Sequence, residues 1–309
     1  MRRLAITVLV IIFAWLLLSF TVLPPYAITP GENPVTLSPE DVDLAYTSII
    51  VPVDGIELEG WWMPAPSARA VLLFVHGAGS NRTSWFIQSL DLYRLLVDQQ
   101  ISVLTVDLRN HGNSPKTDGR LRMGGIEWRD VMAMANWLDE SPQRDLPRIA
   151  MGASMGGATV IQALSQGLQV NGVILFDPAL NTQDALAQGG WVQTGIPTLL
   201  LKPFAWATTT FWGLPSGQDD ALAKALQIAQ PTLLIQDPDD PVTRLTFAEQ
   251  LGAANPQVAL AMAPTTTKTA DCLTGKNRWG SHVAAFSCHP EWFQQSLMAY
   301  IAHILPTDL

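Results

Sequence analysis

The most uniform stretch of the chain is an apolar run near its start. Two arginines precede LAITVLVIIFAWLLLSFTVL, residues 4–23, which carries no charge and only three hydroxyl side chains. At about 1.5 Å per residue a helix of this length crosses the roughly 30 Å hydrocarbon core of a bilayer. The apolar part of a cleavable signal peptide is shorter, about 7 to 15 residues. Residues 1–23 are therefore predicted to form an uncleaved membrane anchor.

Charge on either side of the run predicts its orientation. Arg2 and Arg3 precede it, whereas acidic residues follow it at Glu32, Asp41 and Asp43. By the positive-inside rule the amino terminus stays in the cytoplasm, so the rest of this single-pass chain lies outside. A long signal peptide cleaved near residues 25–27 is the alternative. Both interpretations export the domain.

Strand-like and helix-like segments alternate along the rest of the chain. Residues 46–53 and 56–63 predict two strands joined at Asp54-Gly55, a dipeptide typical of hairpins. Six continuously apolar runs, the pattern of buried parallel strands, lie at 70–75, 101–106, 148–153, 172–176, 232–236 and 257–262. Helical segments are expected at 84–98, 125–139, 155–168, 243–254 and 290–304. The prediction is an α/β fold with a mostly parallel, doubly wound sheet and an antiparallel N-terminal hairpin.

Two intervals depart from this alternation. Residues 24–40 contain five prolines and are expected to be a semi-rigid spacer before a folded domain over 41–309. Residues 178–228 separate two predicted strands by far more than a normal crossover. This insertion is apolar, so we expect a helical lid over a pocket, although an ordinary helical excursion packed on the core fits as well. The aromatic residues that make it apolar include Trp191, Trp206, Phe211 and Trp212.

Composition excludes several classes of protein. With 48% hydrophobic and 15% charged residues, the chain can bury a sizeable core and is not disordered. A net charge of -9 without any Lys/Arg-rich run argues against a nucleic-acid partner. Cys272 and Cys288 lack the spacing of a zinc site, so no metal is expected. In an oxidising compartment they can form a disulfide that contributes about 3 kcal/mol; in the cytosol they would be two unrelated thiols.

A serine at a strand-to-helix turn is the strongest chemical signal. Gly152-Ala153-Ser154-Met155-Gly156 follows one predicted strand directly and opens the next predicted helix. Side chains two positions either side of such a turn would collide, which explains both glycines. The turn places the hydroxyl over the carboxyl edge of the sheet, where the helix amino terminus favours negative charge. Ser154 is therefore predicted to be a nucleophile.

Further motifs accompany this turn in a characteristic order. They are HGAG at 76–79, DLRNHGNS at 107–114, GGIEWRD at 124–130, GASMGG at 152–157 and a PTLLI strand before an acidic loop. Together, over about residues 46–304, they resemble the α/β-hydrolase superfamily: serine esterases and lipases, with similarity to serine aminopeptidase-type hydrolases. The resemblance implies an oxyanion hole made by the backbone N–H groups of Ala78 and Met155. It implies no cofactor and no metal.

A serine hydroxyl needs a base, and five histidines compete for that role. His76 and His111 match family positions that shape the site, and His303 lies late in the last predicted helix. His282 fits the family pattern and the chain order of serine, acid and histidine. We therefore expect His282 to be the base, with His289 as the alternative.

The acid that orients this histidine is expected just after the strand at 232–236. Asp237, Asp239 and Asp240 compete there. Laid on the family pattern, Asp240 takes the acid position before Pro241-Val242, although Gln236-Asp237 stands where the family commonly has His-Gly. Asp240 is the predicted acid, Asp237 stays open, and Asp239 is expected to be a solvated turn carboxylate.

These residues predict a membrane-anchored serine hydrolase that cleaves carboxylic esters, lipid-like if the insertion guards the pocket. The partners expected are a small acyl substrate and the membrane. An exopeptidase with the same triad is an alternative, for which Asp184, Asp219 and Asp220 would bind a free amino terminus. A non-catalytic exported binding protein is another. Oligomeric state and pathway are not set by the sequence.

Overall fold

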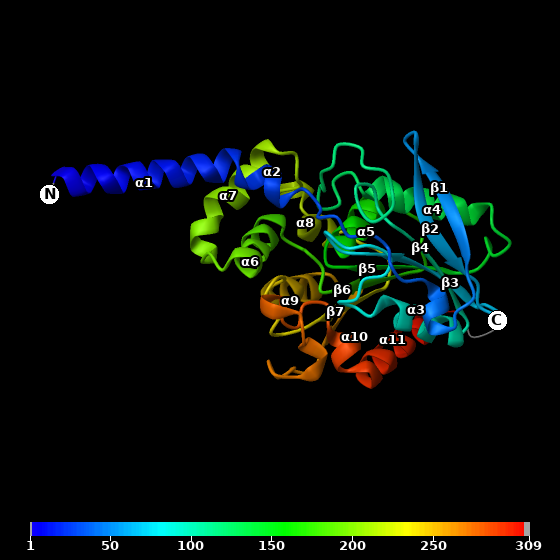
Figure 1. The fold of residues 1–309 in the computed structure, drawn as a ribbon. Coiled ribbons are helices and arrows are strands. Elements are labelled where there is room, and N and C mark those ends of the chain that lie inside the picture. The colour runs from blue at the N-terminus through cyan, green and yellow to red at the C-terminus, as the bar shows by residue number, and fades with distance from the viewer. Residues whose placement is uncertain (1, 306–309) are drawn as a thin grey trace.

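The computed structural model describes residues 2–305; Met1 and residues 306–309, with the expected carboxyl end of the domain, lie outside the described residues. Figure 1 shows a long helix, α1 (Arg2–Thr21), projecting from one end of an α/β domain. The strands are β1 (Thr47–Val53), β2 (Ile56–Met63), β3 (Ala70–Val75), β4 (Ile101–Val106), β5 (Arg148–Ala153), β6 (Gly172–Phe176), β7 (Thr232–Gln236) and β8 (Val258–Met262). The further α-helices are α2 (Leu23–Ala27), α3 (Ser89–Asp98), α4 (Trp128–Asp139), α5 (Met155–Ser165), α6 (Thr182–Thr194), α7 (Thr198–Phe211), α8 (Ala221–Ala225), α9 (Leu245–Ala254), α10 (Ala285–Cys288) and α11 (Pro290–Ile304). Short 3-10 helices cover Pro39–Val42, Gly217–Asp219, Asp271–Leu273 and Asn277–Trp279.

The strands form one 8-stranded sheet in the order β1-β2-β4-β3-β5-β6-β7-β8. β1 pairs antiparallel with β2 and β2 with β4, whereas β3 to β8 run parallel. In the β1–β2 turn, Asp54 and Gly55 both have a positive φ, of 49° and 79°, as a two-residue hairpin turn requires. The predicted mostly parallel sheet with its N-terminal hairpin is confirmed.

Helices cover both faces of the sheet, which explains the continuously apolar strands. Every residue of β3 and β4 is buried. On one face α4 and α5 contribute apolar side chains to the core, and on the other α3 and α11 do so. In α11, for example, Phe293, Leu297 and Ile301 recur at a spacing of four and are fully buried.

One helix begins later than its apolar pattern suggests. A helix was expected from residue 84, but α3 begins at Ser89, and Gln88 has a left-handed φ of 55° that a helix cannot contain. Residues 84–87 instead form a loop beside the cavity described below. Apolar residues are spaced alike in this loop and in α3, so the sequence pattern does not show where the helix begins.

The insertion between β6 and β7 is helical. It contains α6, α7 and α8, and α6 and α7 pack against each other. The Asn181 side chain caps α6 by accepting a hydrogen bond from the Asp184 N–H at 2.8 Å. In Figure 1 this pair lies at the same end of the domain as α1, and α1 contacts α7 directly.

The first helix, α1, is long and apolar enough to span a membrane or to be a signal sequence. The chain after it does not leave the domain. Pro24 and Pro25 lie in the first turn of α2, where a helix tolerates proline, and Ile28 is fully buried in the core. The Leu121 N–H donates to the Ile28 carbonyl at 2.8 Å. Part of the segment expected to be a spacer therefore packs on the domain.

Candidate active site

Ser154 lies alone between the last residue of β5 and the first residue of α5. Its φ of 54° and ψ of -119° are strained for a residue with a side chain, at a cost of about 1–3 kcal/mol. A Cβ on Gly152 would come within 2.3 Å of the Gly156 carbonyl oxygen, and one on Gly156 within 2.1 Å of the Val75 oxygen. Only glycine fits both places, so the backbone forces the Ser154 hydroxyl outward.

His282 and Asp240 complete an unbroken hydrogen-bonded chain to this serine. His282 Nε2 lies 2.9 Å from Ser154 Oγ, and His282 Nδ1 lies 2.7 Å from Asp240 Oδ2. The Asp240 carboxylate also accepts from the Val242 N–H at 2.6 Å and the Thr243 N–H at 3.0 Å, and from Thr243 Oγ1 at 2.7 Å. These donors fix the carboxylate, and the carboxylate fixes the imidazole. The three side chains selected from the sequence thus lie together.

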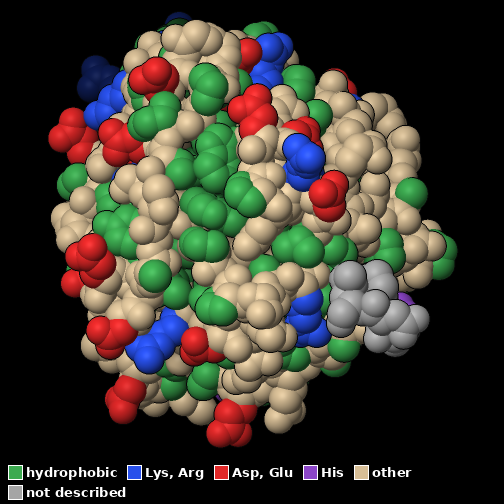
Figure 2. All heavy atoms as spheres, turned by 90° about the vertical axis from the view of Figure 1, so that its right-hand side faces the viewer, with side chains coloured by type: hydrophobic (Ala, Val, Ile, Leu, Met, Phe, Trp, Pro, Cys, Tyr) green, Lys and Arg blue, Asp and Glu red, His purple; other side chains and the backbone are tan. Residues whose placement is uncertain are grey.

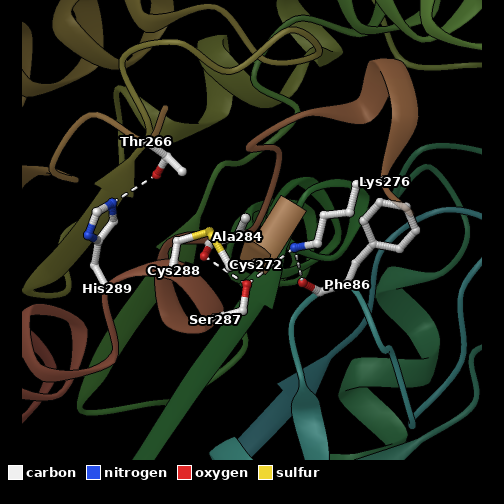
Figure 3. Close-up of a disulfide and its surroundings, with 8 residues drawn as sticks. All are labelled: Phe86, Thr266, Cys272, Lys276, Ala284, Ser287, Cys288 and His289. Atoms are coloured by element: carbon white, nitrogen blue, oxygen red, sulfur yellow. Dashed lines mark hydrogen bonds between the residues drawn. A yellow bond between two sulfur atoms is a disulfide. The ribbon is translucent and has the colours of Figure 1, made fainter. Parts of the chain in front are cut away.

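The alternative candidates lie elsewhere. His289 pairs with Thr266, Nε2 to Oγ1 at 2.8 Å (Figure 3), and Asp239 is exposed. Asp237 is buried, and its Oδ1 accepts from the Asp239 N–H at 2.8 Å. Burial raises the pKa of Asp237 to about 6. Of the three acids in the loop after β7, Asp240 alone is hydrogen bonded to His282 within residues 2–305.

A fourth acid, Asp177, has a place in the site that the sequence reasoning missed. It follows β6 directly, its Oδ1 accepts from the Asp237 N–H at 2.7 Å, and its Oδ2 accepts from the Val283 N–H at 2.8 Å. It thus ties the loop that carries Asp237 and Asp240 to the one that carries His282. Burial, and then the nearby Asp240 charge, hold the pKa of Asp177 well above its usual range. Its position after a buried strand, in GVILFD, was the available signal.

The backbone N–H groups of Ala78 and Met155, beside Ser154, have fixed directions because hydrogen bonds hold the carbonyl of the residue before each of them. The Gly77 oxygen lies 2.8 Å from His76 Nδ1, and the Ser154 oxygen accepts from the N–H groups of Gly157 and Ala179, both at 3.0 Å. In a trans peptide the N–H of one residue points opposite to the carbonyl of the residue before it, so these contacts fix the directions of the N–H groups of Ala78 and Met155. Neither N–H has a hydrogen-bond acceptor within residues 2–305.

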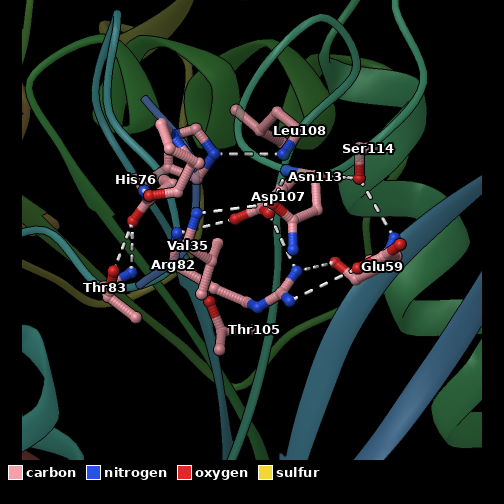
Figure 4. Close-up of polar contacts among 12 residues, drawn as sticks. Val35, Glu59, His76, Arg82, Thr83, Thr105, Asp107, Leu108, Asn113 and Ser114 are labelled. Carbon is pink, nitrogen blue, oxygen red and sulfur yellow. Dashed lines mark hydrogen bonds and ion pairs between the residues drawn. The ribbon is translucent and has the colours of Figure 1, made fainter. Parts of the chain in front are cut away.

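His76 is fixed as a neutral tautomer. Its Nε2 accepts from the Leu108 N–H at 3.0 Å (Figure 4), so the proton lies on Nδ1, which donates to the Gly77 oxygen. Burial, with a smaller contribution from His111, lowers the pKa of His76 to about 3. The ring therefore stays uncharged and serves to hold the loop at 76–79.

A buried polar network supports this loop from below. Figure 4 shows Asp107 between Arg82 and Asn113: its carboxylate accepts from the Arg82 backbone N–H, from Arg82 Nη1 and from the Asn113 N–H, each at 2.8 Å. Arg82 Nη1 also donates to the Glu59 carbonyl at 2.9 Å. The network joins β2, the loop after β3 and the loop after β4.

Asn81 joins the same loop to the chain that follows α1. Its buried amide nitrogen donates to the carbonyls of Asn33 at 3.0 Å and Pro34 at 3.3 Å, and its oxygen accepts from the Thr83 N–H and hydroxyl, both at 2.7 Å. In return, Asn33 Nδ2 donates to the Gly79 carbonyl at 3.2 Å. The loop and the segment after α1 therefore hold each other.

The loop that carries His282 is closed by a disulfide. Cys272 and Cys288 are joined, with Cα atoms 5.3 Å apart, as Figure 3 shows. Within the closed loop, Lys276 is buried and its Nζ donates to the Phe86 carbonyl at 2.8 Å. Burial lowers the pKa of Lys276 to about 8. The predicted disulfide is present, and it brackets His282.

A cavity of about 480 Å³ opens beside the Ser154 hydroxyl. Its wall combines residues 77–80 and 84–87, the insertion helices, His282, and the segment from Leu23 to Asn33. Among the described residues that line it there is no Asp, Glu, Lys or Arg. The contribution of the chain after α1 was not foreseen, because proline content alone gives no sign of where a segment packs.

The carboxylates that would serve an exopeptidase are engaged away from this cavity. Asp184 pairs with Arg244 at 3.1 Å and Asp219 with Lys224 at 3.4 Å. Asp220 is buried, and its Oδ1 accepts from the Thr182 hydroxyl at 2.7 Å and from the Ala221 N–H at 3.0 Å. A peptide amino group in the cavity would meet none of the three.

The group that comes nearest to a metal-binding set in residues 2–305 is Asp177, Asp240 and His282, whose ligand atoms lie within 4.8 Å of one another. Both Asp177 oxygens and both Asp240 oxygens already accept hydrogen bonds, and both His282 nitrogens are engaged. A cation would have to replace these bonds, so the donor set fits a hydrogen-bonded chain better than a metal centre.

Known proteins resemble the chain in sequence and in fold. Phospholipase YtpA of Bacillus subtilis (strain 168) is 29% identical over 127 residues, 40% of this chain and 46% of the phospholipase. The match thus spans about half the length of that relative. The Pyrococcus furiosus esterase Pf2001 superposes with a TM-score of 0.73 at 19% identity, over 90% of this chain and 98% of the esterase. Est1E from Butyrivibrio proteoclasticus, solved with ferulic acid, gives 0.60 at 13% identity, over 83% and 98%.

At such identities the solved structures establish the fold alone. A model of the Alpha/beta hydrolase family matches residues 72–306, which is most of the chain and includes Ser154, Asp240 and His282. The chain therefore belongs to the alpha/beta hydrolase family.

Proposed function

We propose that this chain is a membrane-anchored serine hydrolase that cleaves carboxylic esters with an apolar, lipid-like acyl group. The observation that carries the proposal is the hydrogen-bonded chain from Asp240 through His282 to Ser154. A serine becomes a strong nucleophile when a histidine can take its proton and a carboxylate holds that histidine in the required tautomer.

In the proposed reaction Ser154 Oγ attacks the acyl carbonyl carbon while His282 Nε2 takes the hydroxyl proton. The tetrahedral intermediate carries its negative charge on the former carbonyl oxygen. The N–H groups of Ala78 and Met155 stabilise that charge, each by about 3–4 kcal/mol in the transition state. His282 then gives its proton to the leaving alcohol, and an acyl-enzyme remains.

Water completes the cycle by the same route. His282 takes a proton from water, the hydroxide attacks the acyl carbonyl, and the Ser154 oxygen leaves with the proton from His282. Asp240 stays ionised throughout and stabilises the imidazolium that forms at each step. The products are a carboxylic acid and free enzyme.

The substrate class is inferred from the cavity. Its described lining has no charged Asp, Glu, Lys or Arg side chain, which favours an apolar acyl chain over a peptide amino terminus. Similarity to a phospholipase is consistent with an ester of a lipid. The apolar helix α1 supports the anchor, and the disulfide supports an oxidising compartment outside the cytoplasm.

The test is hydrolysis of p-nitrophenyl esters of increasing chain length by the full chain in detergent. We expect a preferred chain length, and a loss of at least about 10³-fold in kcat/KM for Ser154→Ala and for His282→Ala. Ser165→Ala, at the exposed end of α5, and His303→Ala, exposed on α11, are matched controls that keep full activity.

Two results would count against the proposal. Equal rates for Ser154→Ala and the wild type would exclude Ser154 as the nucleophile. A wild-type chain that neither cleaves the esters nor reacts with a fluorophosphonate probe would favour the non-catalytic binding protein instead. Cleavage of peptides but not esters would favour the exopeptidase.

A further inference from the structure

The helix proposed as the membrane anchor, α1, also packs against the helical insertion at residues 178–228, which we call the lid. Trp15 Nε1 donates to the Leu200 carbonyl of α7 at 3.0 Å. The Phe20 ring lies 5.7 Å from that of Trp206 and 6.2 Å from that of Phe211. Contact between the two helices therefore runs along about the last third of α1, and Figure 1 shows them side by side.

This contact fixes how deep the lid lies if α1 crosses a bilayer. Trp15 precedes the end of α1 at Thr21 by about six residues, or about 9 Å of helix. Leu200 is hydrogen bonded to Trp15, so the amino-terminal part of α7 lies at the same depth. That depth is inside the apolar part of the anchor.

The outward surface of α7 suits such a position. Leu199 is 70% exposed and Phe211 is 62% exposed, and Leu200 and Trp206 are also exposed. The single charged residue of the helix is Lys202, whose long side chain can reach lipid phosphates. Apolar and aromatic side chains beside an anchor, with a basic residue among them, are typical of helices that lie in a membrane interface.

The opposite end of the molecule differs. Figure 2 shows the face turned away from the free end of α1, where acidic and basic side chains are spread among apolar ones. Single exposed apolar residues such as Ile50 on β1 do occur away from the lid. The exposed apolar side chains of α7 differ from these, because α7 packs against the apolar helix α1 and its side chains extend the apolar surface of that helix.

The inner side of the same elements lines the active-site cavity. Leu201 and Phe204 of α7 and Leu23 and Tyr26 of α2 line the cavity that contains the Ser154 hydroxyl. One layer of chain, about one helix thick, therefore separates the exposed apolar surface from the cavity beside the proposed nucleophile.

From these observations we propose that the outer face of α7 is embedded in the bilayer beside α1, and that the cavity receives the acyl chain of an ester lipid directly from the membrane. The inference rests on the proposed function and specifies its substrate as a membrane-resident lipid. The bilayer covers the face that carries Leu199, Leu200, Trp206 and Phe211.

The test uses the full chain reconstituted in phosphatidylcholine vesicles that contain a fluorogenic long-chain diacyl ester. A double variant, Leu199→Asn with Phe211→Asn, changes two side chains that do not line the cavity. We expect it to hydrolyse the vesicle ester at least tenfold more slowly, and soluble p-nitrophenyl butyrate within twofold of the wild-type rate. Ile50→Asn, also an exposed apolar residue, is the matched control that changes neither rate.

A second measurement does not depend on activity. Both native cysteines are in the disulfide, so Leu199→Cys offers one thiol for an environment-sensitive fluorophore. We expect its emission to shift to the blue on reconstitution, and that of the same label on Ile50→Cys to stay unchanged. A label on residue 199 that reports water, or an unchanged vesicle rate in the double variant, would overturn the inference.

The two proposals fail in different ways. Hydrolysis of the soluble ester that does not depend on Ser154 would refute the proposed function itself. Soluble ester hydrolysis that depends on Ser154, together with a label in water at residue 199, would refute the membrane-embedded lid alone.

Discussion

Ile28 offers a direct test of whether the chain after α1 is a tether or a part of the domain. A spacer residue would be solvated, and its truncation would not affect stability. Ile28 is instead 0% exposed and lies in the core cluster that includes Leu121 and Met123. Truncation to alanine removes three buried carbons and leaves a cavity.

Such a truncation in a protein core costs about 2–5 kcal/mol. We expect about 2 kcal/mol for Ile28→Ala, the lower end of this range. With a urea m-value of about 3 kcal/mol/M, this lowers the unfolding midpoint by about 0.7 M. Leu37 belongs to the same segment but is 48% exposed, so Leu37→Ala should cost less than about 0.5 kcal/mol.

The assay is urea unfolding of the full chain in one detergent, followed by tryptophan fluorescence. The wild type, Ile28→Ala and Leu37→Ala are compared at one protein concentration. The reasoning is refuted if all three midpoints coincide, because Ile28 would then contribute no burial energy. A docked segment would also mean that a shortened chain used in activity assays has to keep residues 22–34.

Two further predictions concern the loops around His282. Because the pKa of Asp237 is raised from 3.8 to about 6, its neutral form stabilises the fold below pH 4, and this contribution is lost as the pH rises through 6. The free energy of unfolding of Asp237→Asn, relative to that of the wild type, should therefore rise by on the order of 1–3 kcal/mol between pH 4 and pH 8. The melting temperatures of the two proteins would then diverge as the pH rises, and parallel plots of melting temperature against pH would contradict the prediction. Replacing Cys272 and Cys288 by serine should lower the free energy of unfolding by about 3 kcal/mol and reduce kcat, since His282 lies inside the closed loop. An unchanged melting temperature in that variant would show that the cross-link does not constrain the loop.

Features encoded in local pattern could be predicted, and so could the grouping of Ser154, Asp240 and His282, which the family resemblance implied. Contacts made by long-range packing without such a motif could not. The parallel strands follow from runs such as residues 70–75, in which burial on both faces leaves no place for polar residues. The turn at Ser154 follows from glycines that the backbone geometry requires. Both signals lie within a few residues of the feature that they specify.

Asp177 and Ile28 illustrate the other case. Asp177 acts through N–H groups 60 and 106 residues further along the chain, and no local pattern encodes such contacts. Ile28 is surrounded by prolines that suggest a spacer, yet two of them lie in the first turn of a short helix. At the departure Gln236-Asp237, Gln236 Nε2 donates to the Thr243 carbonyl at 3.0 Å within the same loop, and the Asp237 N–H donates to Asp177, 60 residues earlier in the chain.

The buried amide of Asn81 has a practical consequence for producing the protein. Asn81-Arg82-Thr83 is an acceptor sequence for N-linked glycans, which are attached to the same nitrogen that donates to Asn33 and Pro34. A sugar would replace one of the two hydrogens of that nitrogen, so the two bonds could not both remain, and it has no room at a buried position. A secretory eukaryotic host that modifies the chain before it folds would therefore produce a protein in which the loop around Asn81 is displaced from Asn33 and Pro34, whereas a host without this modification would not.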